Sequence, residues 1–296
     1  MASDLTSEDM RNLPTLQQSL YAFASSPHTF QILRTLPYPT PKLSSPLKAL
    51  YILDSSFNPP TRAHLRICTS ALLQDKPTAV PKRLLLLLAT QNADKAPKPA
   101  SFEQRLAMMS IFAEELVKDA TSSAGGNHSD GDVIVDVGVT KEARFIDKAM
   151  ALEEQADYRE GEKPMEQVHL TGYDTMIRLL DTRYYPPDHT LQPLEGLFEK
   201  HRVRVTRRTD DAWGGRQEQD EYFRRIERGE RESEGGRREW AQRIELIEGR
   251  KDGEDVVSST KVREAAKSRD GEALKKLVTD GVARWILNEK LYIEEL

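Results

Sequence analysis

The sequence predicts an α/β protein built on a doubly wound parallel sheet of about six strands, with helices on both faces. Six short apolar runs suit buried strands, and amphipathic helical patterns lie between them. Strands that alternate with helices form parallel sheets, because each crossover helix covers one face of the sheet. We expect the strand order 3-2-1-4-5-6, in which ligands bind outside the carboxyl ends of the first and fourth strands.

The second run is the clearest strand, because it holds five consecutive leucines, Leu84 to Leu88, after Pro81. The six expected strands are Ala49–Leu53, Lys82–Ala89, Val133–Val139, Gln167–Thr171, His201–Thr206 and Ile244–Ile247. One helix is expected after Ser7, a second is expected to begin near His64, and a third at Ser259. The other expected helices are Phe102–Asp119, Asp147–Arg159, Glu218–Arg228 and Gly281–Lys290.

The chain is expected to divide at one point near its N-terminus. Residues 1–46 are predicted to form a helix and a Pro/Ser-rich connector, and residues 47–296 a single large domain. Two insertions interrupt this domain: a flexible Gly/Ser/Asn-rich stretch at 121–132 and a densely charged stretch at 210–238.

Composition excludes several classes of protein. The formal net charge of −5 argues against bulk nucleic-acid binding, which favours a basic chain. The single cysteine, Cys68, excludes a disulfide framework. No run approaches the ~18 apolar residues of a membrane span, and no signal-like core begins the chain. We expect a cytoplasmic protein; a nuclear pool and a homo-oligomer stay open.

One stretch, Ala49 to Leu73, combines a strand, a polar turn and a helix. This unit binds phosphate in α/β proteins, because backbone N–H groups and the positive end of the helix dipole face the ligand. His64 falls in or just before the first helical turn, where Nε2 could donate to a phosphate oxygen. Ser55, Ser56 and Thr61 add hydroxyl donors.

A second stretch, Val256 to Arg263, is another helix start of the phosphate-binding type. Hydroxyl residues occupy the expected N-cap, and Lys261 and Arg263 follow in the first turn. The helix dipole disfavours cations at this end, so their presence is consistent with an anion bound between them.

The two stretches together resemble a known family. Ser55–His64 (SSFNPPTRAH) and Ser258–Arg263 (SSTKVR) resemble the two signatures of nicotinamide mononucleotide adenylyltransferases, in a divergent fungal-type branch. The resemblance implies a Rossmann-like fold and transfer of an adenylyl group from ATP to nicotinamide mononucleotide. The nucleotide contacts it implies are Ser55, Ser56, Phe57, Asn58, Thr61, His64, Gly172, Asp174, Ser258, Ser259, Thr260, Lys261 and Arg263.

The resemblance also implies roles for these residues. His64 would donate to the α-phosphate, and Arg263 would neutralise the pyrophosphate leaving group. Mg²⁺ would be held through the ATP phosphates, because the sequence offers no dedicated carboxylate cage. Lys95 is the candidate for the acceptor phosphate, with a solvated loop lysine as the equal alternative. Asp174 is expected to contact the nucleotide, with a helix N-cap as the compatible alternative.

The sequence departs from the family at two places. Ser55 stands where the family has glycine, and no tryptophan lies in the region that normally stacks on the nicotinamide ring. Phe145 is the candidate to contact the acceptor base instead. These departures keep a second hypothesis open: a nucleotide-binding protein of the same fold with weak or lost transferase activity, acting as a sensor, a partner protein or a slow ATPase.

Overall fold

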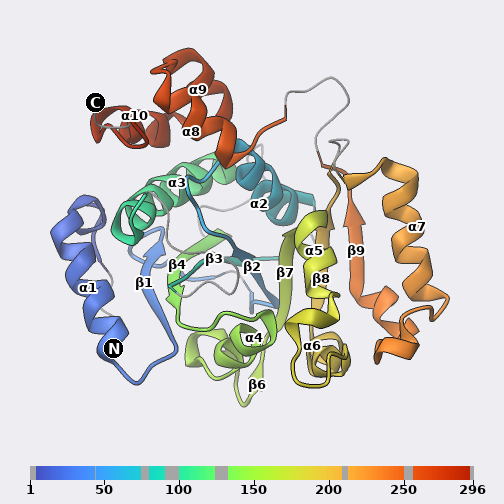
Figure 1. The fold of residues 1–296 in the computed structure, drawn as a ribbon. Coiled ribbons are helices and arrows are strands. Elements are labelled where there is room, and N and C mark those ends of the chain that lie inside the picture. Colours follow the sequence, from blue (N-terminus) through green and yellow to red (C-terminus); the bar gives the residue numbers. More distant parts are fainter. Residues whose placement is uncertain are drawn as a thin grey trace. The chain divides into compact units, whose positions relative to one another are not determined.

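The main sheet has seven strands in the order β1-β4-β3-β2-β7-β8-β9 (Figure 1). The computed structural model describes residues 5–43, 45–74, 80–90, 100–123, 133–208, 213–249 and 256–293. Six of the strands are those predicted, and they follow the predicted order, which is thereby confirmed. The addition is β1, which pairs antiparallel with β4.

The strands are β1 (Phe30–Leu36), β2 (Ala49–Asp54), β3 (Lys82–Ala89), β4 (Val133–Thr140), β7 (Glu166–Gly172), β8 (Arg202–Thr206) and β9 (Ile244–Ile247), with a separate hairpin of β5 (Arg159–Glu160) and β6 (Lys163–Pro164). The α-helices are α1 (Leu13–Ser25), α2 (Arg62–Gln74), α3 (Phe102–Ser123), α4 (Phe145–Glu153), α5 (Tyr173–Leu179), α6 (Glu195–Lys200), α7 (Arg216–Glu227), α8 (Ser259–Lys267), α9 (Gly271–Leu277) and α10 (Asp280–Asn288).

The chain forms two compact units. The first comprises Met1–Lys48, Leu53–Ala143 and Val257–Leu296, and the second comprises Ala49–Ile52 and Arg144–Val256. The first unit therefore contains both the turn after β2 and the C-terminal helices. The boundary between residues 46 and 47 that the sequence suggests stays a prediction.

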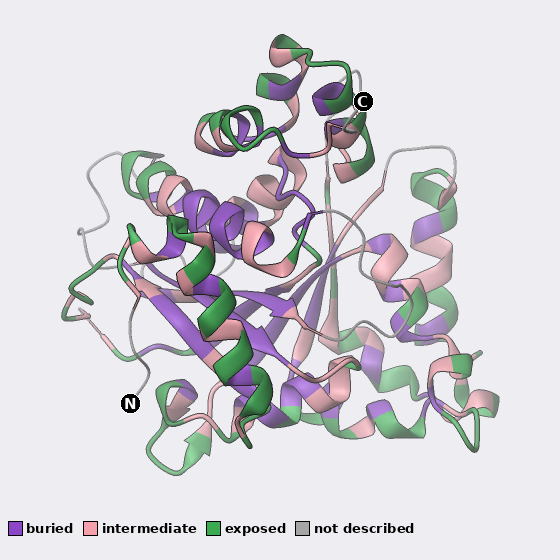
Figure 2. Cartoon of the chain, turned by 60° about the vertical axis from the view of Figure 1, so that its left-hand side comes forward, coloured by how far each residue is buried: buried purple, intermediate pink, exposed green. Residues whose placement is uncertain are grey.

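The first unit is organised around β3 and β4, which pair in parallel. The leucines of β3, Leu84 to Leu88, are almost completely buried, as the apolar run predicts. Figure 2 shows the same contrast throughout: the strands are largely buried, while the helices expose their outer faces. Helix α3 packs on β4, and both α1 and α10 pack on α3.

Two predicted helix boundaries in this unit differ from the structure. The N-terminal α-helix begins at Leu13 rather than just after Ser7, because the Asn12 side chain caps it by accepting from the Thr15 backbone N–H at 3.1 Å. Helix α3 continues to Ser123, so the first three residues of the predicted insertion at 121–132 are helical. The rest of that insertion lies outside the described residues.

The second unit contains the parallel strands β7, β8 and β9. Its core includes Phe198 and Trp240, whose rings stack with centroids 4.8 Å apart. The predicted helix over 147–159 is wrong in its second half. Helix α4 ends at Glu153, and the chain then places Tyr158 in the core and turns at Gly161, whose φ of +63° suits glycine.

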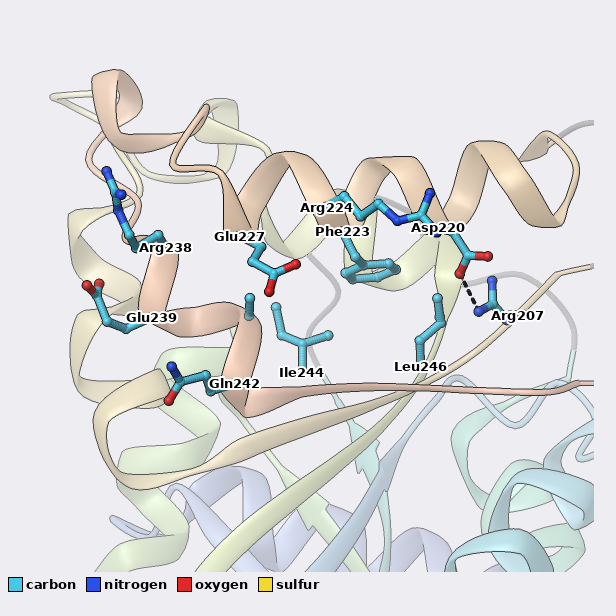
Figure 3. Close-up of a pocket in the computed structure, with 11 residues that line it drawn as sticks. Arg207, Asp220, Phe223, Arg224, Glu227, Arg238, Glu239, Gln242, Ile244 and Leu246 are labelled. Carbon is cyan, nitrogen blue, oxygen red and sulfur yellow. Dashed lines mark hydrogen bonds and ion pairs between the residues drawn. The ribbon is translucent and has the colours of Figure 1, made fainter.

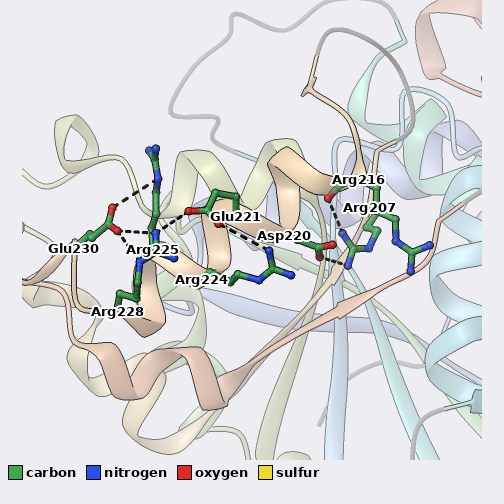
Figure 4. Close-up of polar contacts among 8 residues, drawn as sticks. All are labelled: Arg207, Arg216, Asp220, Glu221, Arg224, Arg225, Arg228 and Glu230. Atoms are coloured by element: carbon green, nitrogen blue, oxygen red, sulfur yellow. Dashed lines mark hydrogen bonds and ion pairs between the residues drawn. The ribbon is translucent and has the colours of Figure 1, made fainter.

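The predicted charged helix is α7, and its charges pair with one another (Figure 4). Arg228 forms ion pairs of 2.7 Å with both Glu221 and Glu230, and Arg207 pairs with Asp220. The arginines here lie among carboxylates, as is typical of a solvent-exposed helix.

A buried ion pair connects β3 to β4 and supplies a test of the first unit. Asp136 is fully buried; it accepts from Arg83 Nε at 2.7 Å and from the Thr35 hydroxyl at 2.8 Å. Replacing Asp136 with alanine leaves the Arg83 charge in the interior without its partner carboxylate. We expect the free energy of unfolding to fall by about 3–5 kcal/mol in urea denaturation.

The matched control is Glu272→Ala, which removes an exposed carboxylate that pairs with Lys275 at 2.8 Å. Exposed pairs contribute about 1 kcal/mol or less. Equal losses in the two variants would contradict the structural role assigned to Asp136.

Candidate functional site

The first predicted motif forms the turn between β2 and α2. The backbone N–H of Ser55 donates to the Leu87 carbonyl of β3 at 3.2 Å, which fixes the start of the turn. Phe57 is fully buried in a left-handed conformation with φ of +43°, an uncommon state for a residue other than glycine. Helix α2 begins at Arg62, so His64 lies in its first turn, as predicted.

Two hydrogen bonds orient the His64 imidazole. The Thr61 backbone N–H donates to Nδ1 at 2.9 Å, and the Thr61 hydroxyl lies 2.9 Å from the same nitrogen. A backbone N–H can only donate, so Nδ1 accepts and the neutral ring carries its proton on Nε2. That proton points to the Ser55 hydroxyl, 3.0 Å away. The turn therefore presents Nε2–H as a donor, as the sequence suggested.

Burial also determines the charge of this ring. Loss of solvation lowers the pKa of His64 from 6.5 to about 4. The ring is consequently neutral at physiological pH and acts there as a hydrogen-bond donor through Nε2. The Phe57 ring lies beside the imidazole, with the two ring centroids 5.4 Å apart.

Ser55 has a role here that the sequence did not reveal. Its backbone is outside the left-handed region, so a serine fits at this position of the turn. Its hydroxyl accepts from His64 Nε2, and a glycine at this position would lack that acceptor. The departure from the family pattern thus adds a contact to the histidine.

The second predicted motif begins α8 and contacts the first. Ser258 is the N-cap, and its hydroxyl accepts from the Lys261 backbone N–H at 3.3 Å. The Ser259 hydroxyl donates to the Pro59 carbonyl at 2.9 Å, across 200 residues of sequence. Arg263 Nη1 donates to the Asn58 carbonyl at 2.7 Å. The structure thus brings the two helix starts together within the first unit.

Two residues that the sequence analysis did not single out also surround Asn58. The Asn58 side-chain oxygen accepts from the Ala100 backbone N–H at 2.8 Å and from the Tyr292 hydroxyl at 2.9 Å. Arg105 lies nearby in α3, and its pKa is lowered chiefly by burial and further by the positive charge of Arg263. Two guanidinium groups close enough to repel one another are suited to an anion.

Other predicted contacts of the first unit are more open. Thr260 is exposed, and its hydroxyl accepts from Arg263 Nη2 at 3.1 Å. Ser56 and Lys261 are exposed as well. Lys95, the candidate for the acceptor phosphate, lies outside the described residues.

Gly172 and Asp174 belong to the second unit. Gly172 is the N-cap of α5, so Asp174 is not a cap but lies in the first turn. A Cβ on residue 172 would come within 2.7 Å of the Asp174 carboxylate, so a larger residue there would require that side chain to move. The carboxylate pairs with Arg178 at 2.9 Å and with Arg208 at 3.3 Å. A ribose contact by Asp174 stays a prediction.

Phe145 is the first residue of α4 and is partly buried. Its ring lies 5.8 Å from the His169 ring, and the Lys148 ammonium is 5.5 Å from its centroid. Burial lowers the pKa of His169 to about 3, so that imidazole is neutral. The role of Phe145 toward the acceptor base stays a prediction.

The second unit also contains a cavity of about 450 Å³ between α7, β9 and the 3₁₀ segment Arg238–Arg243 (Figure 3). Phe223, Ile244 and Leu246 form an apolar wall, and Arg207, Arg224 and Glu227 are among its charged residues. None of the residues predicted to bind nucleotide lines it.

The described residues lack two kinds of feature. They contain no group of three or more His, Cys, Asp or Glu side chains that could hold a metal ion. None of the helices described here is both long enough and apolar enough to cross a membrane.

Comparison with known proteins gives a consistent result. No protein-family model matches the chain. A Schizosaccharomyces pombe protein with the provisional name nicotinamide mononucleotide adenylyltransferase is 33% identical over 233 residues, or 78% of this chain and 81% of that protein. Solved structures of the Plasmodium falciparum nicotinic acid mononucleotide adenylyltransferase, complexed with NaAD and with APC, have TM-scores of 0.51 and 0.50. Each is 12% identical and covers 83% of this chain and 97% of its own.

The sheet and its two motifs define a nucleotidyltransferase with a Rossmann-like α/β fold. Within that class, the chain belongs to the nicotinamide mononucleotide adenylyltransferase family, as the 33% identity over most of both sequences shows. The family that the two motifs suggested is thus confirmed.

The lowered pKa of His64 leads to a test by NMR. The unfolded chain binds more protons than the folded chain between pH 6.5 and about 4, so protonation of His64 destabilises the fold as the pH falls through this range. We expect the His64 ring signals to titrate with a midpoint near pH 4, with the signals assigned from a His64→Gln variant. A midpoint at 6 or above would contradict the partly buried, neutral ring.

Proposed function

We propose that the protein joins ATP to nicotinamide mononucleotide, giving NAD and pyrophosphate by direct in-line attack. The observation that carries the proposal is the meeting of two helix starts, that of α2 with His64 and that of α8 with Arg263, around Asn58. Each helix start offers N–H groups and a positive dipole end, so the pair suits a polyphosphate.

Adenylyl transfer requires positioning of the reactants and stabilisation of negative charge, and it does not require a strong base. The acceptor phosphate is already an anion; its oxygen bonds to the α-phosphorus of ATP as the bond to the pyrophosphate oxygen breaks. The neutral His64 would donate from Nε2 to an α-phosphate oxygen in place of the Ser55 hydroxyl. Because that donor is already oriented by Thr61, its reorganisation during the reaction is small.

The leaving pyrophosphate would be held by α8. Ser259, Thr260 and Arg263 are proposed to contact the β- and γ-phosphates, with Ser258 and Lys261 at the same helix start. Arg263 is fixed by Asn58 and Thr260 at its two terminal nitrogens, so its charge is held in place as negative charge develops.

Mg²⁺ is proposed to enter with ATP, held by the phosphate oxygens, where it would neutralise their charge. The hydroxyl and cationic side chains of the two helix starts suit phosphate oxygens rather than a metal ion. The residues of the chain would therefore bind the triphosphate, and no step is assigned to a metal-binding side chain.

Three residues are proposed to bind the acceptor. Phe145 would contact the acceptor base, Lys95 its phosphate, and Asp174 a ribose hydroxyl. The Schizosaccharomyces relative is named for nicotinamide mononucleotide, and the Plasmodium protein for the nicotinic acid form. The name of the Schizosaccharomyces relative, which is 33% identical to this chain, favours nicotinamide mononucleotide as the acceptor.

Site variants test the two central roles. We expect His64→Ala and Arg263→Ala each to lower kcat by about 100- to 1,000-fold, equivalent to about 2.7–4 kcal/mol of barrier, as for other preorganised charge-stabilising donors. The assay follows nucleotide-dependent pyrophosphate release, with NAD detected by mass spectrometry. It is run with nicotinamide mononucleotide and, in parallel, with nicotinic acid mononucleotide.

Exposed residues of the same types provide matched controls, His28→Ala and Arg284→Ala, which should keep wild-type turnover. Wild-type rates in the His64 variant would remove that residue from the mechanism. If the wild-type protein binds Mg-ATP but forms no dinucleotide with either mononucleotide, the transferase proposal fails, and the non-catalytic alternative takes its place.

A further inference from the structure

The described chain ends beside the turn that holds the first motif. Helix α10 closes with a Schellman motif: Lys290 is left-handed with φ of +51°, and the Leu291 N–H donates to the Ile286 carbonyl at 3.0 Å. Leu291 is buried, as its place in that motif requires. This reversal of the chain leads directly to Tyr292.

The hydroxyl of Tyr292 is a donor to Asn58. It lies 2.9 Å from the Asn58 side-chain oxygen, which also accepts from the Ala100 backbone N–H at 2.8 Å. Because a backbone N–H must face an oxygen, the second contact fixes the orientation of the Asn58 amide. Burial raises the pKa of Tyr292, so the phenol keeps its proton.

Tyr292 makes this contact from a backbone conformation that a tyrosine rarely adopts. Its φ is +64°, in the left-handed region that bulky residues rarely adopt. Such a conformation persists only where the surroundings determine it, and such residues cluster at functional sites.

Asn58 is therefore held by two residues of the C-terminal segment, one in α8 and one just after α10. Arg263 of α8 donates to its backbone carbonyl at 2.7 Å, and Tyr292 donates to its side chain. Helix α10 is itself anchored on α3, since Glu115 accepts from the Gly281 N–H at 2.7 Å. The contact is close, because a Cβ on residue 281 would come within 2.6 Å of Ile111.

We propose that Tyr292 is a positioning residue for adenylyl transfer: by holding Asn58, it keeps the turn that carries Thr61 and His64 in register with Arg263. The inference rests on the proposed function of these residues. Tyr292 acts through Asn58 rather than by contact with the substrate, so its loss misplaces the donors without removing any of them.

The informative variant is Tyr292→Phe, which removes a single hydroxyl. The Ala100 N–H still satisfies the Asn58 oxygen, so no buried acceptor is left unpaired and the fold is retained. The matched control is Tyr185→Phe. Tyr185 is buried in the second unit, and its hydroxyl donates to the Leu179 carbonyl at 2.6 Å.

Kinetics and hydrogen exchange give separate readings. In Tyr292→Phe we expect kcat to fall about ten- to a hundredfold with KM for ATP nearly unchanged, because misalignment weakens the transition state more than ground-state binding. We also expect amide exchange in residues 55–64 to accelerate about tenfold, whether or not the protein turns over. Tyr185→Phe should change neither.

A double-mutant cycle tests the route through Asn58. With Asn58→Ala as background, adding Tyr292→Phe should lower kcat no further, since the residue it acts through is absent. An equal fractional loss in both backgrounds would overturn the proposal. So would unchanged exchange in residues 55–64.

The proposed function can fail separately. Suppose that the wild-type protein forms no dinucleotide, but that amide exchange in residues 55–64 accelerates in Tyr292→Phe and not in Tyr185→Phe. The transferase activity is then refuted, while the stabilisation of the turn by Tyr292 is supported. If the wild-type protein turns over and Tyr292→Phe matches it in kcat, the positioning role is refuted while the transferase stands.

Discussion

The hydrogen bond from the Thr61 backbone to His64 Nδ1 is the contact on which the rest of the site depends. It fixes the ring orientation and leaves the proton on Nε2. It comes from the sequence locally, since Thr61 lies just before α2 and His64 in its first turn. Burial then keeps the ring neutral, so the protein offers a donor of fixed direction whose protonation does not change near neutral pH.

The second requirement is that two distant parts of the chain meet. Ser259 and Arg263 contact the turn through the carbonyls of Pro59 and Asn58, and Tyr292 contacts the Asn58 side chain. All three bonds end on two adjacent residues of a turn whose Phe57 is already left-handed. The turn is therefore fixed from several sides, which is the condition for donors that need little reorganisation.

The sheet could be predicted because its signals are local. Leu84 to Leu88 form a strand long enough to identify without partners, and helices between strands imply a parallel order. The missed strand, Phe30–Leu36, is an antiparallel addition in which three consecutive buried residues, Ile32 to Arg34, interrupt the alternation. Its pairing with β4 is a contact across more than 100 residues, which periodicity cannot reveal.

Site residues could be predicted where their placement depends only on the local sequence around a helix start. His64 and Ser258 lie at helix starts, and their placement follows from the capping pattern. Tyr292 was missed because its contact with Asn58 spans 234 residues. Asp174 was predicted to contact the nucleotide, with a helix N-cap as the compatible alternative. Gly172 is the N-cap instead, and Arg178 and Arg208 bind the Asp174 carboxylate, while the nucleotide contact stays a prediction.

The most direct test of the proposed phosphate donor is the tautomer of His64, read from the nitrogen-15 chemical shifts of its ring in the folded protein at neutral pH. We predict a protonated Nε2 and an unprotonated Nδ1 that accepts a hydrogen bond from the Thr61 amide, with the same tautomer retained when Mg-ATP is added. A proton on Nδ1, or shifts averaged between the two forms, would contradict this prediction, because the ring would then present no fixed donor to the phosphate.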